Sequence, residues 1–110
     1  MNEETNMAEA TRILQCSEFE GLISETFLFW LEGTEQAFEG VLLKAELIKS
    51  ETHPEAVRDP FVLDFKFPAG TNLGQGRFQV KTAKGERFPP MCLIPRGRDE
   101  RGYYMDVTFN

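Results

Sequence analysis

The sequence has few of the residues that build catalytic and metal sites. Its 110 residues include one histidine and two cysteines. Two cysteines, Cys16 and Cys92, are too few for a disulfide framework, so we expect a reducing, cytoplasmic environment. One histidine and two distant cysteines cannot supply the nitrogen and sulfur ligands of a structural zinc site. We therefore expect no bound metal.

Long apolar runs and cofactor motifs are also missing from the sequence. No apolar run approaches the ~20 residues of a membrane helix, so we expect no membrane association. The segment of the first seven residues has two acidic side chains and no basic or apolar stretch, so we expect no secretory signal. The glycines of residues 70–76 match neither the phosphate-binding nor the dinucleotide fingerprint. We expect no cofactor.

The candidate catalytic side chains lack neighbours that would activate them. His53 precedes Pro54 in a segment without apolar periodicity, and no nucleophile or orienting carboxylate is identifiable beside it. Cys92 lies in an apolar run, where a free cysteine behaves as a small buried hydrophobe. Cys16 precedes an expected helix, and we expect a partly exposed thiol there. We expect no enzymatic activity and no catalytic residue, and we keep an enzyme with a reactive cysteine as an alternative.

Phenylalanine and period-two alternation are what the sequence has in quantity. There are ten phenylalanines, and apolar side chains alternate with polar ones in residues 61–67, 77–81 and 103–109. This period is typical of strands with one buried and one solvated face. Because phenylalanine is large and favoured in sheets, we expect its rings to fill the core.

Three further segments are expected to be strands of a less regular kind. Residues 26–31 are apolar on both faces, which predicts a strand buried on both sides or one lying beneath the helix. Residues 37–49 are the longest candidate, and their apolar parity changes near Gly40, which predicts a bulge or a sharp bend there. Residues 88–95 contain three prolines, which cannot donate to a ladder, so we expect these at a sheet edge or at strand ends. An exposed edge there leaves a homodimer as an alternative, although prolines oppose such pairing.

One short helix completes the expected fold. Ser17 followed by Glu20 matches a capping box and predicts one or two helical turns that plug one end of the sheet. Residues 1–12 are expected to be a disordered acidic tail, and residues 13–110 a single domain. The fold class that follows is mainly β: a small six-stranded antiparallel barrel or sandwich with one short N-terminal helix.

Four motifs follow one another in a recognisable order. They are Pro60-Phe61-Val62-Leu63-Asp64-Phe65, Leu73-Gly74-Gln75-Gly76-Arg77-Phe78, Leu93-Ile94-Pro95 and the terminal Phe109-Asn110. In this order they resemble a family of small bacterial β proteins of unknown function, over about residues 19–110. Members carry a short turn such as His-Pro before the Leu-x-Pro strand, where this chain has residues 82–87. The resemblance implies no catalytic residue and a structural or assembly role.

Charge is divided unevenly along the chain, whose net charge is −6. Residues 1–55 hold twelve acidic and three basic side chains, whereas residues 56–110 hold six acidic and nine basic. One interpretation is that neighbouring strands of opposite sign pair across the sheet. The other is that the second half presents a basic face to an acidic partner.

The basic residues of segment 76–101 alternate with aromatic ones. Small barrels bind single strands with cations and stacked aromatics, so an RNA-binding barrel is an alternative. Arginine and tyrosine also anchor protein interfaces. Because the chain is acidic and its phenylalanines are expected inside, we expect a non-enzymatic interaction module that binds another protein as an assembly or regulatory adaptor. The expected contact residues surround the last hairpin: Arg96, Arg98, Arg101 and Tyr103.

Overall fold

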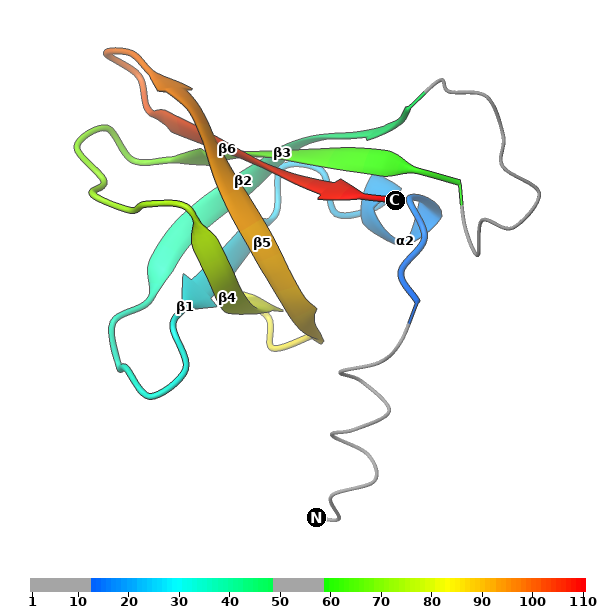
Figure 1. Ribbon diagram of the computed structural model, residues 1–110, viewed down its shortest axis with the longest axis horizontal. Helices are drawn as coiled ribbons and strands as arrows, with labels where there is room; N and C mark the ends of the chain where they lie inside the picture. Colours follow the sequence, from blue (N-terminus) through cyan, green and yellow to red (C-terminus); the bar gives the residue numbers. More distant parts are fainter. Residues whose placement is uncertain (1–12, 49–58) are drawn as a thin grey trace.

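The computed structural model describes residues 13–48 and 59–110 (Figure 1). Its elements are α2 (Ser17–Glu20), β1 (Thr26–Trp30), β2 (Phe38–Leu47), β3 (Phe61–Phe67), β4 (Gly76–Thr82), β5 (Arg87–Arg98) and β6 (Tyr103–Phe109). All neighbouring strands are antiparallel and close into a barrel in the order β1-β2-β3-β6-β5-β4. The predicted six-stranded antiparallel fold is confirmed as a barrel. The expected tail and the segment with His53 lie outside the described residues.

The interior of the barrel is lined by the apolar positions of the alternating strands. In β3, Phe61, Leu63, Phe65 and Phe67 point inward and are at most 1% exposed, while the residues between them are half-buried. Eight of the ten phenylalanines are buried, and Phe38 and Phe109 are half-buried. The prediction that phenylalanine rings form the core is confirmed.

Strand β1 is buried on one face only, so the prediction of burial on both faces is wrong. Phe27 and Phe29 are fully buried, whereas Leu28 and Trp30 are half-buried. A strand in the wall of a closed barrel has one inner and one outer face. On the outside, the Nζ atom of Lys81 lies 5.8 Å from the centre of the Trp30 ring and partly covers it.

Strand β2 contains a bulge, three residues later than the sequence predicted. Gly40 pairs with Phe27 in regular register, and the register with β3 shifts at Leu43. Leu42 points inward and is fully buried, Leu43 is 44% exposed, and Ala45 packs against the core. A bulge adds one residue to a strand, so the inward parity changes there. The change of parity was predicted correctly and its position was not.

Gly40 is required by the space inside the barrel. A Cβ atom at this position would lie 2.8 Å from Cζ of Phe67 and 3.2 Å from Cε2 of Phe29. The two rings meet over the glycine, with their centres 5.5 Å apart. The absence of a side chain at Gly40 therefore lets the Phe29 and Phe67 rings fill this part of the core.

Helix α2 closes one end of the barrel, as predicted, but without the predicted capping box. The N-cap is Cys16, no side chain caps the helix, and the amide of Gln15 donates to Oε2 of Glu18 over 2.7 Å. Phe19 is fully buried and its ring lies 5.0 Å from that of Phe88, centre to centre. It also contacts the rings of Phe27, Phe61 and Phe109. One aromatic side chain thus plugs this end.

The prolines of β5 lie at or next to bulges. Within the described residues, positions 87–93 pair only with β4 and positions 94–98 only with β6. Each proline therefore lies where β5 is paired on one side, in keeping with the predicted edge positions. The register with β4 shifts opposite Pro89 and Pro90, and the register with β6 shifts just after Pro95. A bulge leaves backbone positions unpaired, which removes the need for a donor there.

We expect Gly40→Ala to lower the free energy of unfolding by about 2 kcal/mol, because the added Cβ forces the buried Phe67 ring to move. Urea denaturation measures the change. Gly21→Ala is the control, since a Cβ at Gly21 meets no atom within 4 Å.

Adding Phe67→Leu tests the cause of this loss. The smaller side chain makes room for the methyl group introduced at position 40, so the double variant Gly40→Ala/Phe67→Leu is expected to lose clearly less stability than the sum of the two single variants. Additive losses would contradict the steric explanation.

Candidate functional site

The connection between β3 and β4 crosses the open mouth of the barrel. These strands are consecutive in the chain, but β3 lies between β2 and β6 whereas β4 lies between β5 and β1. Residues 68–75 therefore span the end of the barrel instead of forming a hairpin. Figure 1 shows this loop on the side away from α2, with the β1–β2 loop and the β5–β6 hairpin at the same end.

Two of the predicted contact residues hold this crossing loop in place. The hydroxyl of Tyr103 donates to the carbonyl of Leu73, and the guanidinium of Arg98 donates to the carbonyl of Thr71 over 3.4 Å. Arg98 also lies 4.5 Å from the centre of the Tyr103 ring. Tyr103 is 5% exposed, so its side chain supports Arg98 and the loop and offers little surface to a partner.

The crossing loop and the β1–β2 loop enclose a hollow of about 290 Å³, called here the mouth pocket. Its lining is formed by Leu31, Thr34, Gln36, Phe38, residues 72–76 and Phe78. None of these side chains is charged. The pocket is open to solvent at the barrel mouth, a common place for a ligand site in small barrels.

A second hollow of about 250 Å³, the hairpin pocket, lies beside β2 and β3. Its charged lining residues are Glu39, Lys66 and Arg101. Lys66 packs directly on Gly102, where a Cβ atom would lie 2.8 Å from Cε of Lys66. The lining thus combines two cations, from β3 and from the β5–β6 turn, with one carboxylate from β2.

Asp99 fixes the tip of the β5–β6 hairpin. Its Oδ1 atom accepts from the amides of Arg101 (2.8 Å) and Gly102 (3.0 Å) and from the hydroxyl of Tyr104 (3.2 Å). The bond from the Arg101 amide is the main cause that lowers the pKa of Asp99. Burial, followed by the bond to Asp99, raises the pKa of Tyr104. The tip that carries Arg101 is therefore held by several bonds.

The fourth predicted residue, Arg96, lies on the outer wall of the barrel. It sits at the β5 bulge, and its Nε atom is 3.0 Å from Oδ2 of Asp106. Asp106 pairs with Asp64 across β3 and β6, and its side chain is 17% exposed. Burial is the main cause that raises the pKa of Asp106 to about 6, the nearby Asp64 contributes to the increase, and Arg96 opposes it. Arg96 is thus engaged with Asp106, one member of this pair of carboxylates.

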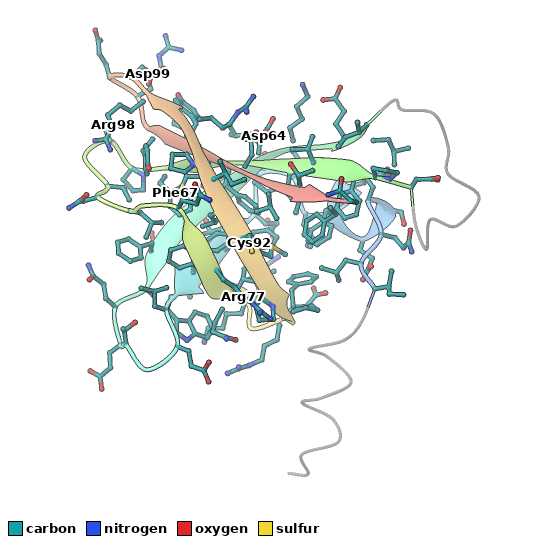
Figure 2. All side chains as sticks on the ribbon, in the orientation of Figure 1. Asp64, Phe67, Arg77, Cys92, Arg98 and Asp99 are labelled. Atoms are coloured by element: carbon teal, nitrogen blue, oxygen red, sulfur yellow. The ribbon has the colours of Figure 1, made fainter. Side chains whose placement is uncertain are left out.

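The structure brings the four predicted contact residues to one hairpin but not to one surface. Arg98 and Tyr103 lie against the crossing loop, Arg101 lines the hairpin pocket, and Arg96 pairs with Asp106. Figure 2 shows Arg98 and Asp99 at the end of the molecule that is far from Arg77. The selection as contact residues stays a prediction.

Each of the two cysteines has the environment that the sequence predicted for the other. Cys16 is 6% exposed, and burial followed by the charge of Glu20 raises the pKa of its thiol. Cys92 is exposed, because the residues on either side of it point into the barrel after the bulge at Pro89 and Pro90. Both cysteines are free. The expectations of a partly exposed Cys16 and a buried Cys92 are wrong.

Across residues 13–48 and 59–110, no group of three or more His, Cys, Asp or Glu side chains is arranged to hold a metal ion. In the same part of the chain, no helix has the length and apolar character needed to cross a membrane.

Opposite charges from the two halves of the chain meet in the described residues: Lys44 lies opposite Asp64 in the register of β2 with β3, and Lys84 of the β4–β5 turn contacts Glu25. Nζ of Lys84 lies 2.9 Å from Oε1 of Glu25, and the hydrogen bond to Glu25 raises the pKa of Lys84. Arg98 and Arg101 have no ion pair within residues 13–48 and 59–110. Pairing between the halves therefore uses Lys44 and Lys84, whereas Arg98 and Arg101 are left without an ion pair in the described residues.

These features define a small closed β-barrel with two hollows beside one arginine-bearing hairpin. The family model of a domain of unknown function, DUF6916, matches residues 14–109, and the chain belongs to this family. The predicted relationship to a family without an assigned activity is confirmed. The searches of curated proteins and of solved structures returned no match.

The sequence reasoning missed the mouth pocket and the Asp64–Asp106 pair. Both aspartates occupy outward positions in the middle of alternating strands, which is a signal for a pair only once the register of β3 with β6 is known. The mouth pocket depends on which strands the 68–75 connection joins, and no residue pattern reports that.

The raised pKa of Asp106 predicts a pH-dependent loss of stability. Its folded pKa of about 6 lies above the unfolded value near 3.8, so between these values the folded state binds more protons. Protonated Asp106 therefore stabilises the folded state at pH 4, and this stabilisation is lost as the pH rises through 6. Asp106→Asn removes this titrating group. As the pH rises from 4 to 7.5, we expect the free energy of unfolding of the variant to increase by about 1–2 kcal/mol relative to that of the wild type.

Denaturation at several pH values measures this difference, and carboxyl carbon shifts of Asp106 measure its titration directly. A second variant, Arg96→Gln, tests the same assignment. Because Arg96 lowers the pKa of Asp106, its removal is expected to move the titration to higher pH. A stability difference that stays constant with pH would refute the assignment.

Proposed function

We propose that the protein is a non-enzymatic interaction module of the bacterial cytoplasm that binds another protein. The binding element is the arginine hairpin, residues 96–103. One observation carries this proposal: Arg98 and Arg101 are exposed and lack ion pairs in the described structure, while Tyr103 and Asp99 hold the hairpin that bears them.

A cationic hairpin held in this way suits an acidic protein surface. Binding costs free energy for every side chain and loop that must become ordered, and existing hydrogen bonds reduce that cost. Arginine is a frequent anchor of protein interfaces because its planar group pairs with carboxylates through two parallel bonds. The hairpin pocket adds Lys66 beside Arg101, so two neighbouring cations are available for acidic side chains.

The arrangement of aromatic rings supports a protein partner over single-stranded RNA. Stacking on bases requires exposed ring faces beside the cations. Of the four rings that alternate with the basic residues in the sequence, those of Phe78, Phe88 and Tyr103 are at most 5% exposed, and that of Tyr104 is half-buried. The cations are outside, whereas three of the four rings are inside.

The double charge reversal Arg98→Glu/Arg101→Glu tests the proposal. Used as bait in a native lysate, the wild type is expected to retain proteins that the variant loses by at least tenfold, because the new carboxylates repel an acidic partner. Arg77→Glu/Arg87→Glu carries the same charge change on β4 and β5, away from the hairpin, and is expected to retain them. Arg96 is left unchanged because a glutamate there would face Asp106.

Thermal denaturation of each bait verifies that it is folded before capture. Capture that weakens with added salt is also expected, since the proposed contact is between opposite charges. If the two double variants and the wild type retained the same proteins in the same amounts, the arginine hairpin would not be the binding element.

A further inference from the structure

We propose that the mouth pocket binds one uncharged aromatic or aliphatic side chain of the partner protein. This inference rests on the proposed function, because the partner is the protein that the arginine hairpin holds. The volume is the first argument. At about 290 Å³ the hollow is at the lower limit of ligand pockets, which run from roughly 300 to 1,000 Å³. That space suits one amino-acid side chain better than a nucleotide cofactor.

The lining selects an uncharged group. Leu31, Phe38, Leu73 and Phe78 supply apolar surface, and the polar lining side chains are hydroxyl or amide groups, such as that of Gln36. An apolar side chain placed here leaves water and gains free energy from burial. A charged side chain would lose hydration without meeting an opposite charge, which is costly.

The crossing loop also offers backbone donors to a bound chain. Gly74 and Gln75 are exposed, and among the hydrogen bonds of the described residues none has the amide of either residue as its donor. Peptide carbonyls on either side of the anchoring side chain can accept from them. The bonds from Tyr103 to Leu73 and from Arg98 to Thr71 already hold the loop, so binding requires little further ordering.

The charges around the pocket favour a segment of protein over a small free molecule. The β1–β2 loop carries two exposed carboxylates, Glu32 and Glu35, next to its lining residues. On the other side, Arg98 is bonded to the crossing loop. A peptide presents flanking side chains that complement both charges at once, whereas a small neutral molecule leaves both unused.

Capped amino acids test the pocket on the isolated protein without a partner. We expect N-acetyl-phenylalanine amide to shift the amide resonances of residues 31–38 and 72–78 with millimolar affinity. N-acetyl-lysine amide and N-acetyl-glutamate amide are expected to bind at least tenfold more weakly. A capped tripeptide with Asp and Lys on either side of Phe, in one of its two orders, is expected to bind several-fold tighter than the capped phenylalanine at low salt. Equal shifts from all three capped amino acids, or shifts elsewhere only, overturn the proposal.

Gly74→Phe blocks the pocket with its own side chain. A Cβ at Gly74 meets no atom within 4 Å, so the backbone accepts the substitution. Gly21→Phe is the matched control, because Gly21 has the same free space and lies at the α2 end. We expect Gly74→Phe to abolish the shifts and Gly21→Phe to retain them. Leu31→Lys, at a 45% exposed rim position, is a second variant expected to weaken binding. Retained binding in both pocket variants overturns the proposal.

The two proposals fail in different ways. The capped amino acids report on the pocket without any partner, so their binding does not depend on the arginine hairpin. If they bind and Arg98→Glu/Arg101→Glu still captures the same proteins, the hairpin proposal is wrong and the pocket stands. If the charge reversal abolishes capture but the capped amino acids do not bind, the pocket proposal is wrong. Tighter binding of a neutral sugar such as methyl glucoside would also overturn it.

Discussion

Closing six strands into a barrel fixes the width of its interior, and this chain fills that width with phenylalanine rings. The fit depends on a position without a side chain. At Gly40 the Phe29 and Phe67 rings occupy the space where a Cβ would be. At the α2 end, Phe19 completes the filling by contacting rings from β1, β3, β5 and β6. Interiors packed at crystal-like density tolerate few changes of volume, so the barrel holds its loops in defined places.

The features with functional interest follow from how the chain crosses this barrel. Because β3 and β4 are not neighbours, residues 68–75 must span the mouth, and the buried Tyr103 holds them there through Leu73. The same tyrosine ring supports Arg98. One aromatic side chain of the core thus links the crossing loop with the cationic hairpin. A surface built on such supports needs little reordering when a partner binds, which is the physical basis for the interaction module we propose.

Alternation in β3 and β6 was enough to predict strands with one buried face, and the spacing of turns predicted six antiparallel strands. Local backbone details were less accessible. The parity change in β2 was seen but assigned to Gly40, because a glycine is a usual mark of a bulge, whereas the extra residue is Leu43. The Pro89–Pro90 bulge likewise turned Cys92 outward. A bulge is a mismatch between two strands, so neither strand contains it alone.

The sequence by itself determined the composition of the core, the strand class and the basic character of the last hairpin, since each depends on residue type and period along one segment. The tertiary structure decided what those residues face. Asp64 and Asp106 form a pair only through the register of β3 with β6, and the mouth pocket exists only because one connection joins strands that are not neighbours. Side-chain chemistry is local, whereas strand order and register are set by the simultaneous packing of all six strands.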